Sequence, residues 1–169
     1  MFRVGGEKII IFDLDGTLAN DDHRAHYLHP SHTDPRCSKV YDGQGICPCG
    51  AKRDWSNYFA RASDDRPKSQ VIQICKDLAR WHQIYILSGR SESTADVTRK
   101  WLRQQEVPYD RLRLRAIEDR TQDDVLKIQW VEDMGIKDRV ICIFEDRQRV
   151  VDAWRAAGYT CFQVAPGNF

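Results

Sequence analysis

The sequence predicts an α/β fold, a Rossmann-like parallel sheet with helices on both faces, and three observations lead to this prediction. Short apolar strands alternate with helical segments from about residue 67 onward. The run "KIIIF" near the start is continuous and β-branched, as in a strand that is covered on both faces. Polar residues able to do chemistry follow several strands, where sites lie in such sheets.

The elements can be justified in chain order. The first strand runs from Lys8 to Phe12, and the apolar pattern then stops between Asn20 and about Arg66. His, Asp, Pro, Gly, Ser and Cys are common there, which predicts an insert with little regular structure. We therefore expect a core of residues 1–19 and 67–169 and a cap-like insert of residues 20–66.

The second part of the core alternates regularly. Helical spacing in "PKSQVIQICKDLARWH" precedes the strand "QIYILSGR", and the helix "STADVTRKWLRQQ" precedes the strand "LRLR". The segment "TQDDVLKIQWVEDMG" predicts a helix with Thr121 as its cap and Gly135 as its stop. The strand "RVICIFED", the helix "RQRVVDAWRAAG" and the strand "YTCFQVA" complete the expected sheet.

Composition limits the possible functions. The 169 residues are 41% hydrophobic and 30% charged, which excludes a disordered tail, and the net charge of +1 excludes a global attraction to polyanions. No apolar run approaches the ~20 residues that span a bilayer, so we expect no membrane contact. The strand begins almost at once, so we expect no signal peptide and a cytoplasmic location with reduced thiols. No protein partner is evident.

Apolar surroundings predict core positions for three cysteines: Cys75, Cys142 and Cys161.

Two carboxylates close the first strand. Asp13 and Asp15 are two residues apart on an extended segment, so their side chains face the same way and repel each other. A cation, or a reaction that needs both groups, has to offset that repulsion. The pair Glu145 and Asp146 ends a later strand, and carboxylate oxygens are ligands that Mg²⁺ prefers.

The order of four motifs resembles a known superfamily. "DLDGTLA", "ILSGR", Lys127 on a later helix and "FEDR" follow one another as in the haloacid-dehalogenase phosphotransferases. "LRLRAIEDRTQDDVLK" and "FEDRQRVVDAWRAAGYTCFQVAPGNF" are similar to the 3′-phosphatase half of bacteriophage polynucleotide kinase/3′-phosphatases. The phosphate loop G-x-x-x-x-G-K-[ST] of a kinase half is absent. The resemblance implies the haloacid-dehalogenase fold and a Mg²⁺-dependent phosphatase that forms an aspartyl-phosphate on 3′-phosphorylated DNA or RNA ends or nucleotides.

The resemblance also assigns roles. Asp13 is the expected nucleophile and Asp15 the acid/base, and Mg²⁺ is expected on Asp13, the Asp15 carbonyl and Asp146. Glu145 is a further candidate Mg²⁺ ligand, although it departs from the usual Asp-Asp pair of the family. Ser88 and Lys127 are expected to hold the phosphoryl oxygens. Six residues are expected to contact or orient substrate: Arg24, His26, Gly89, Arg90, Arg115 and Asp123. Arg147 and Arg149 are assigned to the solvated surface.

The insert suggests a second metal. Cys37, Cys47 and Cys49, with His32 or His29, form a set suited to tetrahedral zinc, and the alternative is a loop with free thiols. Three nearby aromatic residues are assigned to packing of the insert, with base stacking as the less favoured role: Trp55, Tyr58 and Phe59.

Two alternatives to the polynucleotide 3′-phosphatase stay open. The same chemistry could serve a free nucleotide or another small phosphomonoester, which the near-neutral net charge favours. The other alternative is a zinc-stapled nucleic-acid-binding module with a relic active site. The filled catalytic positions argue against that module.

Overall fold

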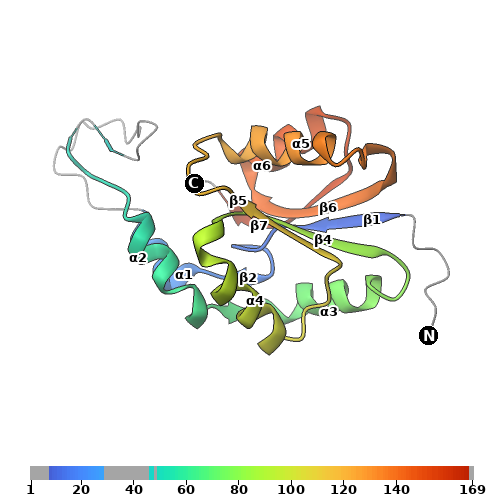
Figure 1. The fold of residues 1–169 in the computed structure, drawn as a ribbon, viewed down its shortest axis with the longest axis horizontal. Coiled ribbons are helices and arrows are strands. Elements are labelled where there is room, and N and C mark those ends of the chain that lie inside the picture. Colours follow the sequence, from blue (N-terminus) through green and yellow to red (C-terminus); the bar gives the residue numbers. More distant parts are fainter. Residues whose placement is uncertain (1–7, 29–45, 48, 168–169) are drawn as a thin grey trace.

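A five-stranded parallel sheet organises the molecule (Figure 1). The computed structural model describes residues 8–28, 46, 47 and 49–167. The strand order is β5-β4-β1-β6-β7, so the first strand lies at the centre with two strands on either side. Every pairing in this sheet is parallel, as predicted. The strands are β1 (Ile9–Phe12), β4 (Gln83–Ser91), β5 (Arg111–Arg115), β6 (Val140–Arg147) and β7 (Cys161–Gly167).

Helices cover both faces of the sheet because β1 is buried on both sides. Ile10 and Phe12 pack into one cluster with Trp101 of α4, while Ile9 and Ile11 pack into a second cluster with α5 and α6. The alternation of side chains along a strand produces this division. The helices are α3 (Ser69–Leu78), α4 (Ala95–Gln104), α5 (Asp123–Asp133) and α6 (Gln148–Ala156), with short 3-10 turns η2 (Glu92–Thr94) and η3 (Lys137–Arg139).

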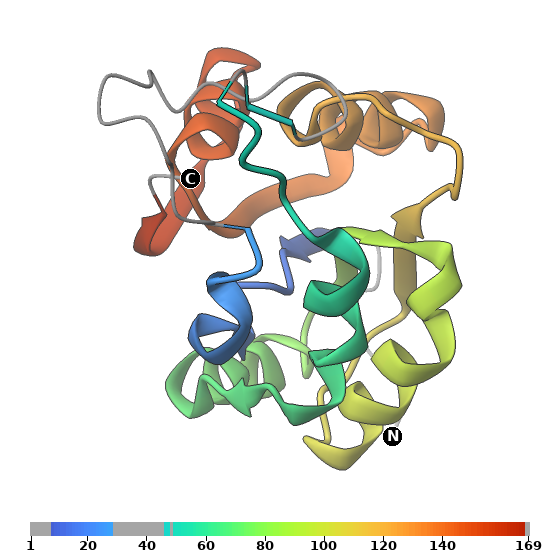
Figure 2. The same cartoon turned by 90° about the vertical axis from the view of Figure 1, so that its left-hand side faces the viewer.

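The segment after β1 leaves the sheet at the carboxyl ends of its strands and returns through a small stem. β2 (Ala19–Asn20) and β3 (Arg66–Pro67) pair antiparallel at the two ends of this segment. Between them lie α1 (Asp22–Ala25), α2 (Trp55–Ala60) and η1 (Ala62–Asp64). Figure 2 turns this end toward the viewer and shows α2 in front of the sheet. The segment therefore overhangs the edge where β1, β4 and β6 end.

One predicted helix boundary is wrong. Thr121 was expected to cap helix α5, but the helix begins at Asp123 with Gln122 at the N-cap and no side-chain cap bond. The backbone N–H of Thr121 instead donates to the Asp119 carboxylate at 2.8 Å, so the loop before α5 has its own turn. The predicted stop at Gly135 is confirmed, because its φ of 60° is one that glycine adopts without strain.

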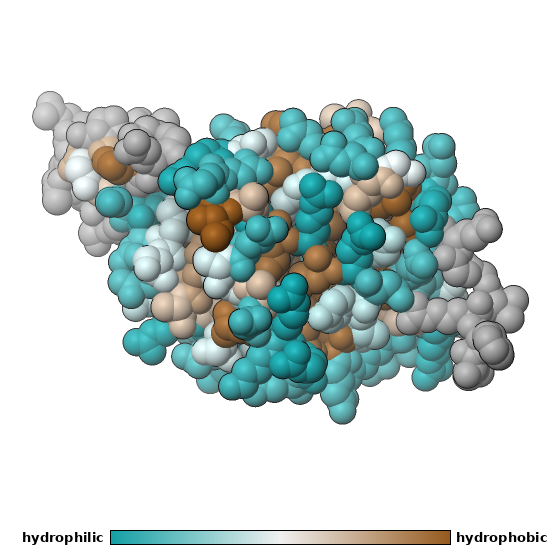
Figure 3. Space-filling view, viewed as in Figure 1, coloured by the Kyte–Doolittle hydropathy of each residue, from teal (hydrophilic) through white to brown (hydrophobic). Residues whose placement is uncertain are grey.

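The surface contains no extended apolar area on the face seen in Figure 3, where small brown patches are separated by teal residues. No helix in the described part of the chain is long and apolar enough to cross a bilayer.

Candidate active site

The first predicted carboxylate meets the predicted lysine at the centre of the sheet edge. Asp13 directly follows β1, and its backbone N–H donates to the Phe144 carbonyl of β6 at 2.9 Å. Lys127 Nζ on α5 donates to Asp13 Oδ1 at 2.6 Å and to Glu145 Oε2 at 2.7 Å. All three side chains are almost completely buried. Lys127 is therefore shared between two carboxylates that come from neighbouring strands.

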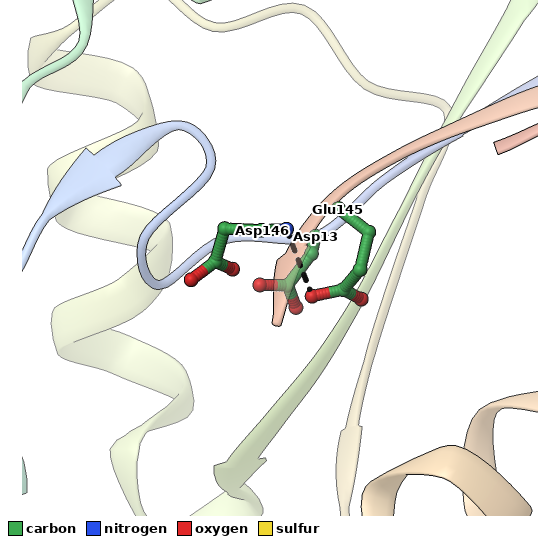
Figure 4. A group of neighbouring side chains, drawn as sticks. All are labelled: Asp13, Glu145 and Asp146. Atoms are coloured by element: carbon green, nitrogen blue, oxygen red, sulfur yellow. Dashed lines mark hydrogen bonds between the residues drawn. The ribbon is translucent and has the colours of Figure 1, made fainter. Parts of the chain in front are cut away.

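Asp146 completes a group of acidic side chains (Figure 4). Asp13, Glu145 and Asp146 each offer a carboxylate oxygen, and these oxygens lie within 4.8 Å of one another. It is the one such group among the residues that the structure describes. The backbone N–H of Asp146 donates to Glu145 Oε1 at 3.2 Å, and Thr17 Oγ1 donates to Asp146 Oδ1 at 3.3 Å. The chain thus holds three anions at one point.

The electrostatics of this group are unfavourable without a further cation. Burial raises the pKa of Asp13 well above its ordinary value, and the charge of Glu145 adds to the rise. Burial and the Glu145 carboxylate also raise the pKa of Asp146, to about 7. Burial alone would lower the pKa of Lys127, but Asp13 and Glu145 raise it, so Lys127 stays charged. One ammonium does not offset three crowded carboxylates.

Asp15 lies in a different environment from Asp13. Arg90 donates to it through Nε at 2.9 Å and through Nη2 at 2.6 Å, and Arg24 Nη2 donates to it as well. Burial alone would raise the pKa of Asp15, but the Arg90 and Arg24 guanidinium groups hold it well below its usual range. Arg24 and Arg90, expected to contact substrate, are fully buried here and face Asp15. A substrate contact by either remains a prediction.

Asp65 is a member of this network that the sequence does not reveal. It follows η1, and its side chain is completely buried. Oδ1 accepts from Arg24 Nε at 2.6 Å, and Oδ2 accepts from Arg90 Nη2 at 2.6 Å. In the sequence Asp65 is the second of two adjacent aspartates before Arg-Pro, where a solvated turn is the simplest interpretation. Only the tertiary structure distinguishes it from its exposed neighbour Asp64.

A second ion-pair group lies beside Asp13. Arg115 donates to the Asp123 carboxylate and the Thr121 carbonyl, and its Nε donates to the Gly89 carbonyl at 3.2 Å. Arg147 Nη1 donates to Asp123 Oδ2 at 2.7 Å, so its assignment to the solvated surface is wrong. A Cβ at Gly89 would lie 2.5 Å from Asp123, so the glycine lets β4 approach this pair closely.

The remaining predicted residues are more scattered. Ser88 is buried at the end of β4, where its Oγ accepts from the Arg90 backbone N–H at 3.2 Å. His26 is exposed after α1 and is not among the residues that line the cleft beside Asp13.

Of the predicted zinc ligands, Cys47 and Cys49 have sulfur atoms 3.5 Å apart, too far for a disulfide between them. The others, His29, His32 and Cys37, lie outside the described residues.

A cleft of about 730 Å³ opens from Asp13 and Asp15. Arg115, Lys127 and Arg147 line its inner end. Residues of α2 and of the loop between β5 and α5 also line the cleft. This size lies within the roughly 300–1,000 Å³ of ligand pockets in general.

Gly16 sets the position of Asp146. Its φ is +78°, and a Cβ there would lie 2.1 Å from Asp146 Oδ2. We expect Gly16→Ala to cost about 1–2 kcal/mol of stability through backbone strain and to displace the Asp146 carboxylate, lowering activity by at least about 100-fold. Gly158→Ala is the matched control, because its φ is +88° and nothing lies within 4 Å of its Cβ. Thermal unfolding should show the loss from backbone strain in both variants, and a further loss in Gly16→Ala from the contact with Asp146. Full activity in Gly16→Ala would contradict this account.

Comparison with known families shows which family the chain belongs to. A family model described as the polynucleotide kinase PNKP phosphatase domain matches residues 50–169. The chain belongs to this family. The resemblance to haloacid-dehalogenase phosphatases is thereby confirmed, and the chain is a phosphatase of that class. Lys127, Glu145 and Asp146 lie within the matched range, and the structure joins them to Asp13, which precedes it.

Solved structures agree with this membership of the PNKP phosphatase family. A chain in the Pnkp1/Rnl/Hen1 RNA repair complex is 26% identical, with a TM-score of 0.69, over 96% of this chain and 44% of that one. A second structure of that complex gives 25% identity and a TM-score of 0.70, over 98% and 48%. This chain therefore spans less than half the length of those relatives.

Two more distant structures confirm the haloacid-dehalogenase fold. The haloacid-dehalogenase-like hydrolase SP0104 from Streptococcus pneumoniae is 18% identical, with a TM-score of 0.62, over 92% of this chain and 83% of that one. A magnesium complex of BT-2542 from Bacteroides thetaiotaomicron is 15% identical, with a TM-score of 0.56, over 97% and 96%.

Proposed function

We propose that this chain removes the phosphate from the 3′ end of a DNA or RNA strand as a Mg²⁺-dependent phosphomonoesterase. The observation that carries the proposal is the buried Asp13–Lys127–Glu145–Asp146 group, of which Asp13, Lys127 and Glu145 line a cleft, in a chain of the PNKP phosphatase family. The match to a chain of an RNA repair complex supports a nucleic-acid end as substrate. The class of reaction, phosphate ester hydrolysis, follows from the family itself.

The residues present fit a divalent cation. When its three carboxylates are ionised, this buried group carries two more negative charges than the Lys127 ammonium balances, and one divalent cation would offset them. The donors are all oxygens, which suits Mg²⁺. The Asp13 and Asp146 carboxylates and the Asp15 backbone carbonyl would hold it, with Glu145 beside them. When bound, it would screen the repulsion between these carboxylates and a phosphate dianion.

The first half of the proposed reaction uses Asp13 and Asp15. A carboxylate oxygen of Asp13 attacks phosphorus, and the bond between phosphorus and the ester oxygen breaks. The leaving sugar oxygen takes a proton from Asp15. Arg24 and Arg90 favour the ionised form of Asp15 in the free protein. A phosphate dianion bound beside Asp15 raises the pKa of this carboxyl, because a like charge disfavours ionisation, and so favours the protonated form that donates the proton.

The second half reverses the role of Asp15. A water molecule attacks the phosphorus of the aspartyl-phosphate, Asp15 accepts the water proton, and the bond to Asp13 breaks to release inorganic phosphate. Lys127 neutralises the phosphoryl oxygens, as does the Arg115 guanidinium at the cleft. Ser88 lies at the strand end behind them.

A substrate panel tests the function. We expect phosphate release from 3′-phosphorylated DNA or RNA strands to exceed release from 5′-phosphorylated strands and from free 3′-nucleotides by more than about tenfold in kcat/KM. Asp13→Asn protein prepared in the same way excludes a contaminating phosphatase. Higher kcat/KM with free nucleotides would favour the small-substrate alternative, and no turnover of any ester would favour the relic-site alternative.

A structural zinc in the insert is a separate proposal. The 3.5 Å between the Cys47 and Cys49 sulfur atoms suits two thiolates on one tetrahedral ion. Purified protein should then contain about one zinc per chain, and Cys47→Ser with Cys49→Ser should release it. The double variant should weaken substrate binding more than it changes the Mg²⁺-dependent rate. Protein that contains no zinc, whatever the loading conditions, would refute the site.

A further inference from the structure

The cleft extends well beyond the space that a phosphate group needs, and its outer part is aromatic. Trp55 and Phe59 of α2 line it, and their ring centroids are 5.8 Å apart with an interplanar angle of 27°. Trp55 is 37% exposed, although it is a large aromatic side chain. Both residues were assigned to packing of the insert, and the structure instead directs them toward the cleft.

Tyr58 fixes this aromatic pair relative to the catalytic residues. It is buried, its hydroxyl donates to Asp21, and the Arg24 guanidinium lies 4.0 Å above its ring. Tyr58 also meets Trp55 edge-on at 5.9 Å. Because Arg24 contacts Asp15, the platform and the acid/base residue belong to one connected structure.

Other residues that line the cleft complement the aromatic pair. Ile117, in the loop between β5 and α5, lines the same cleft and is 63% exposed. Arg120 and Arg149 line it as well and are exposed. The cleft lining therefore adds an apolar side chain and two exposed cations to the aromatic pair. A flat, apolar group attached to a chain of phosphates matches both features.

We propose that Trp55 and Phe59 form a stacking platform for the terminal nucleobase of the substrate. Arg120 and Arg149 would then lie along the path of the next phosphate. The inference rests on the proposed function and adds to it a requirement for a base on the terminal sugar. Stacking on aromatic side chains tolerates any base, so little base preference is expected.

The test compares a strand that ends in a 3′-phosphorylated nucleotide with the same strand ending in a 3′-phosphorylated abasic sugar. Wild-type kcat/KM should favour the base-bearing end by about 5- to 150-fold, the range measured for one stacked base. Trp55→Ala should remove most of this preference and leave kcat/KM for the abasic end within about threefold of wild type. Trp55→Phe should keep most of the preference.

Trp81→Ala is the matched control, because Trp81 is 63% exposed and does not line the cleft. If wild type hydrolyses both ends equally, or if Trp55→Ala loses the same factor on both, the platform is refuted while the phosphatase function stands. If wild type hydrolyses neither end, the proposed function itself fails.

A second observation carries an independent inference about Asp65. Arg24 and Arg90 each bridge two carboxylates, Asp15 at the cleft and Asp65 behind it. Asp65 does not line the cleft, so it does not touch substrate. Its backbone carbonyl accepts from Trp101 Nε1 at 2.8 Å, which ties it to α4. We infer that Asp65 is a positioning residue that fixes both guanidinium planes and, through them, the Asp15 carboxylate.

The positioning role of Asp65 can be tested by comparing substrates whose leaving groups do and do not need a proton. A sugar alkoxide needs the proton that Asp15 supplies, whereas nitrophenolate leaves without one. We expect Asp65→Asn to lower kcat/KM by about 10- to 100-fold on a 3′-phosphorylated strand and by less than about threefold on p-nitrophenyl phosphate. Asp64→Asn, at the exposed neighbour, should change neither.

Asp15→Asn serves as the reference, since it removes the proton donor itself. If Asp15→Asn shows the difference between the two esters and Asp65→Asn does not, the inference about Asp65 is overturned. An equal loss on both esters in Asp65→Asn would indicate a purely structural role. If Asp15→Asn shows no difference either, the acid role in the proposed function is the part that fails.

Discussion

Asp13→Asn is expected to abolish turnover and leave the fold intact. An amide of nearly the same shape replaces the carboxylate, so packing at the end of β1 is preserved, but an amide cannot form the aspartyl-phosphate. Loss of a nucleophile commonly costs a factor near 10⁶ in kcat, so we expect a loss of at least about 10⁴-fold. Phosphate release from a 3′-phosphorylated strand measures it directly.

Stability provides the control for this prediction. Burial and the charge of Glu145 raise the pKa of Asp13, so the ionised form of this side chain is disfavoured in the metal-free protein. Removing its charge should keep or raise the unfolding temperature measured without Mg²⁺. Asp96→Asn, at an exposed position in the first turn of α4, should leave activity unchanged and cost less than about 1 kcal/mol of stability. Turnover above a hundredth of wild type in Asp13→Asn would rule out Asp13 as the nucleophile.

The strands, the helices and the acidic group could be predicted from the sequence because each has a local signal. The β-branched run Ile9–Phe12 predicts a central strand, and the acidic residues directly after it and after β6 have no simple role in packing. Helical periodicity found α3 to α6 within a few residues. Strand order was not predicted, because it depends on which edges pair and not on any one segment.

The partners of Arg24 and Arg90 and the burial of Asp65 could not be predicted from the local sequence. Arg24 and Arg90 were expected to hold a phosphate because they follow strand ends, yet in the described structure their partners are carboxylates. Asp65 is 50 residues from Asp15 in the chain. Only the fold of the insert onto the sheet edge decides that it is buried between two guanidinium groups. The same fold decides that Trp55 faces the cleft.

Asp146→Ala and Glu145→Ala are expected to differ, and the difference tests how the acidic group holds its cation. Among the residues that the structure describes, Asp146 Oδ1 accepts a long bond from Thr17 Oγ1 at 3.3 Å, which leaves this carboxylate available to a metal. Its loss should lower activity by at least about 10³-fold at any practical Mg²⁺ concentration. Chelation of Mg²⁺ should have the same effect in wild type and be reversed when Mg²⁺ is restored.

Glu145 acts through Lys127 instead. It accepts from Lys127 Nζ at 2.7 Å and from two backbone N–H groups, those of Asp146 and Arg147. Without it Lys127 would pair with Asp13 alone and compete with the cation for that carboxylate. Glu145→Ala should therefore lose about 10- to 100-fold, the range typical of residues that orient metal ligands, and higher Mg²⁺ should recover part of the loss. Equal and complete losses in both variants, with no recovery by Mg²⁺, would instead make Glu145 a direct ligand on a par with Asp146.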